Sequence, residues 1–511
     1  MATPAAARAS SLRTPSTALP PWVARAGATC AGGLGVALLG LVLARAPLEA
    51  AFAVVIGGIG LVAIVWRPAL GLYALAFAIP FGSVREVTIA GASVGVSQAL
   101  ALVTIAAWLA RRLAFPRRVA FPRCDAPLLG GSAIPWALAA YLGALLVALW
   151  PAQSIPLAAK EMAKWIEFAA VLMLTAGELG PRETRGLVAA LLLAGALQGL
   201  LGAYQFVRQI GPPGFILMGR FMRAHGTFAQ PNPYGGFLGL LLPLSYATVV
   251  ATWREAWPPG RRRHPGRLLL WGLALVATVT MAAGLVMSWS RGALLGAAAG
   301  AGLVLLAMGR RVWLALAVVV LLATPVVAST PSVVPTVLVE RLTEALDYIG
   351  APDVTAIEVT DANFANLERL AHWRAAWRMF ERAPWLGVGT GQYAAVYPTV
   401  AVPRWEDPLG HAHNILLNVM AEGGLLALAA YLGLMAAAVW TTWRAARGAH
   451  GLQRAVTLGS LGMMGHLLAH NMVDNLYVHE MYLLIAMLLG MVLAQQRRAG
   501  LVMNRSKRGT P

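Results

Sequence analysis

Long apolar runs dominate this chain and restrict its fold more than any other feature. They recur from residue 28 to residue 495, and a helix that crosses a membrane needs about 20 such residues. Only 12% of the 511 residues are charged, whereas about 25% is usual in soluble domains, and the mean hydropathy is +0.67. We therefore expect an all-α, polytopic membrane protein. A soluble multidomain protein is excluded, because too little polar surface exists to cover several globules.

Reading the apolar runs against this length predicts about 12–14 transmembrane helices. The third run is short and contains Pro80. The predicted spans cover residues 28–45, 48–66, 67–82, 93–110, 131–150, 159–177, 185–207, 233–253, 268–288, 292–309, 311–328, 413–440, 453–473 and 477–495.

The formal net charge of +19 fits a membrane protein better than a nucleic-acid-binding protein. With the N-terminus inside, every dense basic cluster falls on one side of the membrane, which is the pattern of cytoplasmic loops. These clusters are Arg111–Arg123, Pro181–Arg185, Arg254–Arg267, Arg310–Arg311, Arg444–Arg454 and Arg497–Arg508. The two cysteines, Cys30 and Cys124, predict neither a disulfide framework nor a metal site.

These spans divide the chain into five parts. We expect a cytoplasmic tail, an N-terminal transmembrane bundle, a large extracytoplasmic loop, a C-terminal set of transmembrane helices and a basic cytoplasmic tail. Their residues are 1–27, 28–328, 329–412, 413–495 and 496–511.

The loop of residues 329–412 differs in charge from the rest of the chain. It holds ten acidic residues and six arginines, and a loop of this length is usually functional. Apolar residues at three- and four-residue spacing predict an amphipathic helix over 363–382. Pro384 would end this helix, and the glycines of 387–391 predict a turn-rich connector.

Several arginines and histidines fall on the extracytoplasmic side, where the positive-inside rule does not explain them. The guanidinium fork binds phosphate oxygens in pairs and keeps its charge, and a neutral histidine can accept a proton near pH 7. Together they suit displacement of a diphosphate by a hydroxyl group. Arg291 could instead reach toward headgroups as an anchor, and Arg369 could lie on a solvated helix face. The candidate residues are Arg220, Arg223, Asn232, Arg291, Arg369, His411, His413 and Asn414.

Two further polar groups lie near the outer ends of spans. Lys160, Lys164 and Glu167 share a helix face and are either an internal Lys–Glu pair or a functional group. His466, His470 and Asp474 stack at four-residue spacing and could join His411 and His413 in a zinc site. A polar cluster that supports the catalytic histidine is favoured, because Asn471 and Asn475 suit a hydrogen-bond network. We expect no metal and no cofactor, since the only tight acidic pair of the loop is Glu406–Asp407.

The region from Arg220 to Trp440 resembles the O-antigen ligase and O-antigen polymerase superfamily. Four motifs in order carry the resemblance: Arg223–Tyr234 before a span, the Ser-Arg-Gly turn of residues 290–292, an Arg-x3-Trp helix followed by Pro and Gly-x-Gly (Arg369, Trp373, Pro384, Gly387–Gly389), and His413-Asn414 followed by Glu422-Gly423-Gly424. The N-terminal half is similar only in its hydropathy, and an inserted stretch at 348–363 leaves the acceptor open.

The resemblance implies a membrane-embedded, GT-C-like glycosyltransferase that acts at the outer face of the bacterial cytoplasmic membrane. Its donor would be a glycan on undecaprenyl diphosphate, and its acceptor a glycolipid or saccharide hydroxyl such as that of lipid A-core. By this resemblance Arg291 and Arg369 would hold the diphosphate and His413 would be the base. Further substrate contacts are expected from Arg220, Arg223, Asn232, Lys164, His411 and Asn414.

Three alternatives remain open. An O-antigen polymerase would join lipid-linked repeat units on the same carrier, and a protein O-oligosaccharyltransferase would use a protein acceptor. A transporter or flippase of lipid-linked sugars would need polar residues spread through the spans. The candidate residues instead gather on one side, which favours an enzyme. Besides its substrates, the expected partners are membrane lipids and not nucleic acid.

Overall fold

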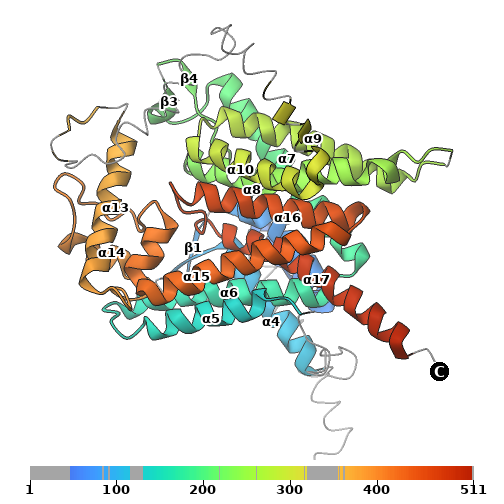
Figure 1. Cartoon of the computed structure of the whole chain (residues 1–511), viewed down its shortest axis with the longest axis horizontal. Helices are drawn as coiled ribbons and strands as arrows, with labels where there is room; N and C mark the ends of the chain where they lie inside the picture. Colours follow the sequence, from blue (N-terminus) through green and yellow to red (C-terminus); the bar gives the residue numbers. More distant parts are fainter. Residues whose placement is uncertain are drawn as a thin grey trace, which may run out of the picture. The chain divides into compact units, whose positions relative to one another are not determined.

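The computed structural model describes residues 47–114, 131–312 and 363–508, apart from 83–85, 90, 91, 218 and 261, and a few residues between 314 and 360. The predicted tail 1–27, the first span 28–45 and both cysteines lie outside the described residues, as do most of the span 311–328 and of the first half of the loop 329–412. The described residues are almost entirely helical (Figure 1), which confirms the all-α class.

The helices follow the predicted apolar runs closely. They are α2 (Leu48–Trp66), α3 (Ala69–Phe81), α4 (Val96–Ala114), α5 (Ile134–Val147), α6 (Ile155–Glu178), α7 (Pro181–Arg208), α8 (Pro231–Ala256), α9 (Pro265–Met287), α10 (Arg291–Met308), α13 (Phe364–Arg382), α14 (Tyr393–Val396), α15 (Ile415–Gly448), α16 (Gly451–His470) and α17 (Met481–Arg508), with short 3-10 turns at Pro213–Phe215 and Tyr397–Thr399. Two antiparallel hairpins pair β1 (Glu86–Ile89) with β2 (Ala92–Gly95) and β3 (Ile216–Leu217) with β4 (Phe221–Met222).

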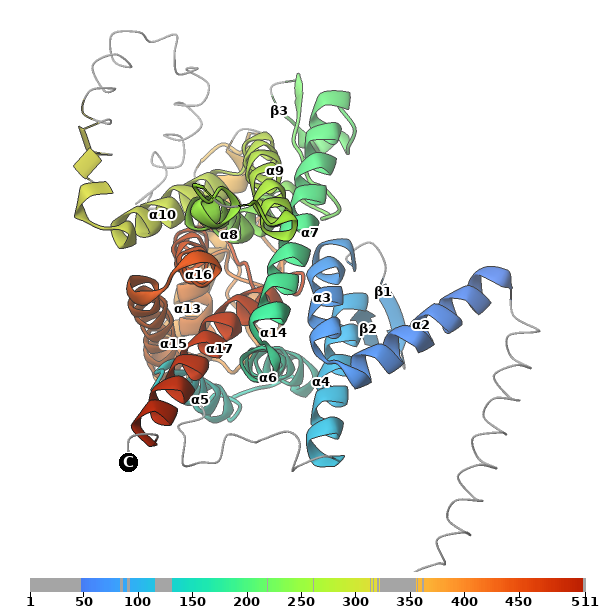
Figure 2. The same cartoon turned by 90° about the vertical axis from the view of Figure 1, so that its right-hand side faces the viewer.

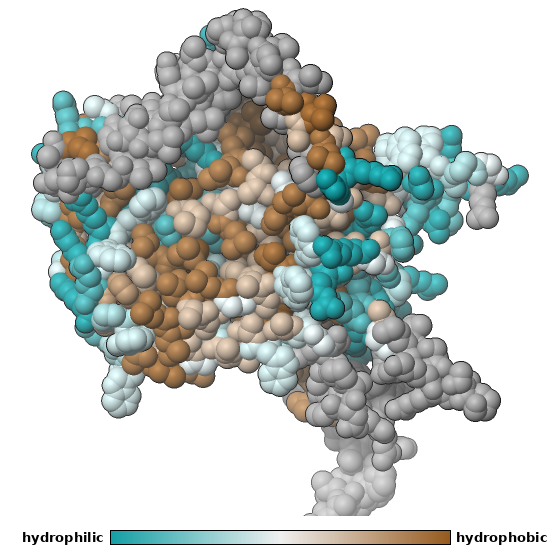
Figure 3. Space-filling model, in the orientation of Figure 1, coloured by the Kyte–Doolittle hydropathy of each residue, from teal (hydrophilic) through white to brown (hydrophobic). Residues whose placement is uncertain are grey.

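Length and hydropathy mark this as a multi-pass membrane protein. Among the described residues, six helices are long and apolar enough to cross a membrane (α4, α7, α8, α9, α10 and α15), and three apolar helical segments are shorter (55–66, 69–81 and 134–147). Figure 3 shows apolar side chains over the middle of one face, with polar side chains gathered at its two sides. This distribution is expected for a surface that faces lipid. The total of about 12–14 spans stays a prediction.

The core lies around α17. The chain divides into two compact units, residues 1–63 and 64–511, and α17 belongs to the second. Nearly every residue of 481–494 is buried, and α17 packs against α3, α6, α15 and α16 (Figure 2). A helix that is apolar all round is expected at such a central position.

Helix α17 does not end with the predicted span at residue 495 but continues to Arg508. Arg497 Nη2 donates to the backbone oxygen of Gly177 at 2.9 Å, and Arg498 Nη1 donates to that of Leu179 at 2.6 Å. Both carbonyls belong to the C-terminal end of α6, where carbonyl groups lack partners within the helix. The first arginines of the tail therefore dock the extended helix onto its neighbour.

The predicted span 93–110 begins three residues late, because 92–95 form a strand instead of a helical turn. Val87 and Ile89 alternate with polar residues and pair with Val94 and Ala92. β-branched residues in alternation favour a strand, and the apolar run that follows had hidden this signal. Helix α4 then starts at Val96.

Helix α15 is broken at Gly424, which has φ +64° and ψ −163°. The carbonyls of Ala421 and Glu422 accept the N–H groups of Val388 and Gly389 at 2.9 and 3.0 Å. Beyond the break, the N–H of Leu425 donates to the carbonyl of Pro384 at 2.8 Å. The two predicted glycine motifs therefore meet, since the segment 384–389 hydrogen-bonds to the backbone that the broken helix exposes. A Cβ at Gly387 or Gly424 would collide with the facing backbone.

The same segment is also tied to the end of α5 and the start of α6. Thr390 donates from N and Oγ1 to the carbonyls of Ala148 and Leu145, at 3.0 and 2.8 Å. Gln392 Oε1 accepts the backbone N–H groups of Gln153 and Ser154 at 3.1 and 2.7 Å. The segment thus fixes one end of the bundle.

Helix α13 lies across the ends of the bundle helices, at the left of Figure 1. It starts one residue after the predicted Asn363 and ends at Arg382, as expected. Its buried face includes Leu367, Ala371 and Met379. Trp377, which the three- and four-residue apolar spacing would place on the buried face, is instead 48% exposed. Small residues on this face let the backbone of α13 approach α15, and the larger tryptophan remains outside.

Candidate functional site

His413 and Asp474 form a pair at the start of α15. His413 Nδ1 donates to Asp474 Oδ1 across 3.4 Å. Burial alone would raise the pKa of Asp474, but the hydrogen bond from His413 and the charge of Arg369 hold this pKa below its usual range. The carboxylate is therefore ionised and accepts the Nδ1 proton, which leaves Nε2 of His413 as the basic nitrogen. His413 has φ +52°, a conformation that structures retain chiefly at functional sites.

Two further histidines contact His413 and remain neutral. His411 Nδ1 accepts the backbone N–H of His413 at 3.1 Å, and burial together with the charge of His413 lowers the pKa of His411 to about 3. The ring of His372 lies 5.6 Å from that of His413, and burial followed by the charge of His413 lowers the pKa of His372 to about 4. His413 alone of the three is paired with a carboxylate.

Helix α13 brings Arg369 to this pair. The indole Nε1 of Trp373 donates to the carbonyl of His413 at 3.4 Å, which fixes α13 against the start of α15. Arg369, one turn earlier, is close enough to Asp474 for its charge to lower the pKa of that carboxyl. Glu368 lies beside them, and burial raises its pKa although the charges of His413 and Arg369 act in the opposite direction.

Arg291, the first residue of α10, contacts α13, and Arg223, which follows β4, contacts the α9–α10 junction. Arg291 Nη2 donates to Oδ1 of Asn366 on α13 at 2.6 Å. Arg223 Nε donates to the carbonyl of Ser288 at 2.9 Å, and its Nη2 donates to Asn232 Oδ1 at the same distance. The predicted arginines 223, 291 and 369 are thus linked through α13 and the junction, although they are far apart in sequence.

Three buried nitrogen atoms at this site have no hydrogen-bond partner among the residues that the structure describes. They are Asn366 Nδ2, Arg369 Nε and His413 Nε2. Buried polar groups are normally paired, so such a group needs an explanation. Two lie on one helix and the third lies where that helix is attached to α15. Asn366 Nδ2 and Arg369 Nε can donate to ligand oxygens, and His413 Nε2 can accept the proton of a hydroxyl group.

The remaining predicted residues have different surroundings. Arg220 lies on the β3–β4 hairpin with its guanidinium over the ring of Phe221, 5.2 Å from the centroid. Asn232 holds Arg223. Asn414 caps α15, since its Oδ1 accepts the N–H groups of Leu416 and Leu417 at 3.0 and 3.2 Å. Arg220 is therefore not brought to the His413 cluster by any contact of the described residues, and Asn414 positions the helix that carries His413.

The predicted Lys–Glu pairing occurs with a different glutamate. Lys164 Nζ contacts Glu161 Oε2 at 2.6 Å, one turn earlier on α6. Glu167 instead accepts from Tyr482 Oη at 2.5 Å and from Gln98 Nε2 at 3.3 Å. The shared face of α6 had suggested Glu167, but the side-chain hydroxyl of α17 engages it.

Two histidines of α16, His466 and His470, form a polar cluster next to Asp474. His470 Nε2 lies 3.9 Å from Asp474 Oδ2, and His470 Nδ1 lies 3.3 Å from His466 Nε2. Both rings fill space left by glycines: a Cβ at Gly296 would lie 2.6 Å from His466 Nδ1, and one at Gly292 would lie 2.8 Å from His470 Cδ2. The cluster holds Asp474 in place.

Within the described residues, one group of histidine and acidic side chains could hold a metal ion. Ligand atoms of His411, His413 and Asp474 lie within 4.8 Å of one another, so the set excludes the predicted members His466 and His470. The positive charge of Arg369 near Asp474 opposes a divalent cation there. This charge balance favours proton chemistry at the cluster.

Sequence reasoning missed two residues of the site, Asn366 and Glu422. Asn366 precedes Arg369 by one helical turn, and this i, i+3 spacing could have indicated it. Glu422 accepts the N–H of Tyr393 at 2.9 Å and lines a cavity of about 410 Å³ that reaches His411. In the sequence, Glu422 was noted only as part of the Glu422-Gly423-Gly424 motif and was given no role at the site.

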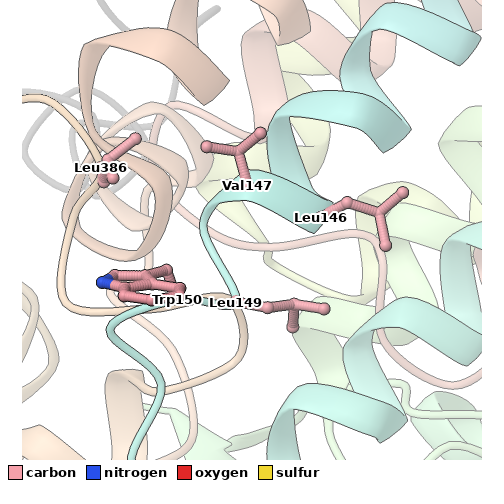
Figure 4. Close-up of a pocket in the computed structure, with 5 residues that line it drawn as sticks. All are labelled: Leu146, Val147, Leu149, Trp150 and Leu386. Carbon is pink, nitrogen blue, oxygen red and sulfur yellow. The ribbon is translucent and has the colours of Figure 1, made fainter.

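A second hollow near the α5–α6 connection is entirely apolar. Leu146, Val147, Leu149, Trp150 and Leu386 lie around it (Figure 4), and Trp150 is 91% exposed. It offers no polar side chain to a sugar or a phosphate and fits a lipid-facing surface.

A comparison with known protein families matches part of the chain that carries this site. Residues 276–432 match the family model described as O-Antigen ligase. The matched range includes Arg291, Arg369, His411 and His413. No curated protein matches the chain.

Proposed function

We propose that this chain, which belongs through residues 276–432 to the O-antigen ligase and polymerase superfamily, is a metal-independent glycosyltransferase. It moves a glycan from a polyprenyl diphosphate to an acceptor hydroxyl. The observation that carries the proposal is the group of unpartnered buried nitrogen atoms Asn366 Nδ2, Arg369 Nε and His413 Nε2. The first two can donate to a diphosphate, and the third, on a histidine paired with Asp474, can accept a hydroxyl proton.

The arginines bind the donor. Arg369 has an unpartnered Nε, and Arg291 is fixed by Asn366 on the same helix. Negative charge gathers on the diphosphate as it leaves, so these contacts strengthen in the transition state, and binding energy becomes catalysis. Arg223, held by Ser288 and Asn232, adds a third charge. A metal would be redundant beside these cations.

His413 activates the acceptor. Its Nε2 takes the hydroxyl proton while the acceptor oxygen bonds to the anomeric carbon, and the bond from that carbon to the phosphate oxygen breaks with its electron pair on the diphosphate. Asp474 stabilises the imidazolium that forms. Attack opposite the leaving group inverts the anomeric centre.

The site would lie at the outer face of the bacterial cytoplasmic membrane, with 329–412 as the extracytoplasmic loop and 28–328 and 413–495 as transmembrane parts. The basic loops on the other side support this orientation. Single cysteines placed at Arg118, Arg262 or Arg447 should be protected from an impermeant thiol reagent in intact cells. Those at Arg223, Arg369 or His411 should react. Labelling at position 369 only after the cytoplasmic side is opened would contradict the orientation.

A reconstituted assay tests the reaction. Purified protein in lipid vesicles is given an undecaprenyl-diphosphate glycan and either a lipid A-core acceptor or a second lipid-linked repeat unit, which separates ligase from polymerase. Arg369→Lys should lose about a hundred- to a thousandfold in rate, because a point charge does not replace the fork. Arg378→Lys, on the same helix with its guanidinium on the carbonyl of Val400, is the matched control. Equal rates for both variants would refute the role of Arg369.

A further inference from the structure

We infer that the cavity beside His411 is the binding site of the acceptor, and that it takes an uncharged sugar residue. This inference rests on the proposed function and names the acceptor class for the same site. The cavity has a volume of about 410 Å³, within the usual range of small-molecule sites of about 300–1,000 Å³. It has room for a terminal sugar rather than a long glycan.

The cavity adjoins the catalytic histidine. His411 lines it, and the rings of His411 and His413 are 4.3 Å apart. His411 Nδ1 is occupied by the backbone N–H of His413, so the proton of the neutral ring is on Nε2 and can be donated to a sugar oxygen. A sugar in the cavity would present its hydroxyl at the edge where His413 begins.

The wall offers no net positive charge to an anion. Its acidic residues (Glu161, Glu422 and Glu480) outnumber its lysines (Lys160 and Lys164). Lys164 is paired with Glu161 at 2.6 Å, so its charge is largely compensated. The arginines that suit a diphosphate do not line this cavity. Donor and acceptor therefore have chemically different places, and a phosphorylated acceptor residue is disfavoured here.

Hydrogen-bonding groups in the wall match hydroxyl groups. Asn418 Oδ1 accepts the N–H of Ala412 at 3.0 Å, and Asn475 Oδ1 accepts that of Tyr477 at 2.9 Å. Each amide keeps its NH₂ group for a ligand oxygen. Glu422 accepts the N–H of Tyr393 with one oxygen, and its other lone pairs can accept from a hydroxyl group. Donors and acceptors side by side are what a polyol requires.

Aromatic side chains complete the wall. Tyr141, Trp165, Tyr477 and Tyr482 line the cavity, and the first three pack on one another, with Trp165 4.7 Å from Tyr141 and 5.1 Å from Tyr477 between centroids. Each of the four rings is at most 5% exposed, so together they form a rigid, close-packed backing that reaches the cavity only at its edges. The polar groups of Asn418, Glu422 and Asn475 in front of this backing suit a sugar better than an acyl chain.

Two isosteric variants test the cavity. Asn418→Asp keeps the oxygen that accepts from Ala412 but removes the NH₂ donor, and Glu422→Gln keeps an oxygen for Tyr393 but replaces the other carboxyl oxygen with an NH₂ group. Glu381→Gln, an exposed change on α13, is the matched control. The probes are the methyl glycosides of glucose, galactose and N-acetylglucosamine, with glucose 6-phosphate as the anionic counterpart and a serine-containing peptide as the protein-type counterpart.

Binding is measured by saturation-transfer NMR in nanodiscs, without donor, and the acceptor KM is measured in the transfer assay. We expect a methyl glycoside to bind the wild type and the Glu381→Gln variant, to bind both cavity variants at least tenfold more weakly, and to exceed glucose 6-phosphate in affinity. Donor binding should not change in the cavity variants. Unchanged glycoside binding and KM in both variants, or preferential binding of the phosphate or the peptide, would overturn the inference. Glycoside binding without any transfer by the wild type would instead contradict the proposed reaction.

Discussion

Replacing Asp474 with Asn tests how His413 is made basic. In the wild type the ionised carboxylate accepts the Nδ1 proton of His413 across 3.4 Å, so Nε2 is free to take a proton. An asparagine amide can instead donate to Nδ1, which moves the ring proton to Nε2 and disables the base. The variant changes one heavy atom. Because Oδ1 also accepts the backbone N–H of Asn475 at 2.9 Å, an NH₂ group that faces Nδ1 of His413 leaves this N–H without its oxygen.

The size of the loss can be bounded from the structure. A hydrogen bond to a charged group contributes about 1.5–3 kcal/mol, so losing it slows the chemical step at least about tenfold, since about 1.4 kcal/mol corresponds to a factor of ten. The upper bound is complete loss of general-base catalysis, which contributes about a hundred- to ten-thousandfold. Because the tautomer change also acts, we expect Asp474→Asn to lie near the upper range.

Single-turnover transfer from a lipid-linked glycan measures the effect, with donor binding and size-exclusion profile scored separately. Asp407→Asn, the same exchange at an exposed loop position, is the control. If Asp474 acts through His413, adding Asp474→Asn to His413→Ala should cost little more than His413→Ala alone. Rates within twofold of wild type, or losses that multiply in the double variant, would refute the pairing.

Four further outcomes are expected. Arg291→Lys should lose about a hundred- to a thousandfold in turnover; near-normal turnover would leave Arg291 as an anchor. His413→Ala should bind donor yet lose about a hundred- to ten-thousandfold in single-turnover rate, whereas His411→Ala should raise the acceptor KM but keep substantial single-turnover rate at saturating acceptor, and the opposite result would move the base by two residues. Transfer should persist in EDTA; loss that added divalent metal restores would show metal dependence. Folding stability should fall as pH falls from 6.5 toward 4, by up to about 3 kcal/mol, because the unfolded chain binds a proton that buried His372, with its pKa of about 4, excludes. His372→Gln should flatten this decline in thermal melts, and an unchanged slope would contradict the assignment.

Hydropathy predicted most described helices because lipid leaves a chain few alternatives to helix. The runs behind α7, α8 and α9, for example, begin and end within a few residues of the observed helices. The pattern failed where a local signal competed with the apolar run, as at the strand 92–95, or where a distant partner extended a helix, as Gly177 does for Arg497.

The sequence predicted part of the candidate site, for a different reason. Arginine and histidine on the side predicted to be extracytoplasmic are anomalous under the positive-inside rule, so Arg291, Arg369 and His413 stood out individually. Their partners did not, because the contact of His413 with Asp474 joins residues 61 positions apart. Asn366 carries no charge and resembles any polar residue of a helix. The cavity wall draws on six segments that are far apart in sequence, and no periodicity predicts such a convergence.

The break in α15 has a consequence for how this protein can be re-engineered. The strip 384–389 completes the hydrogen bonding of a transmembrane helix, so it is a structural member of the bundle although it is connected as a loop. A chimera that exchanges residues 329–412 for those of a related protein would deprive four backbone groups of α15 of their partners unless the inserted strip repeats the same glycine geometry. Grafts should therefore be cut between Arg382 and Pro384, which leaves 384–412 with the host and makes the preceding segment the exchangeable unit.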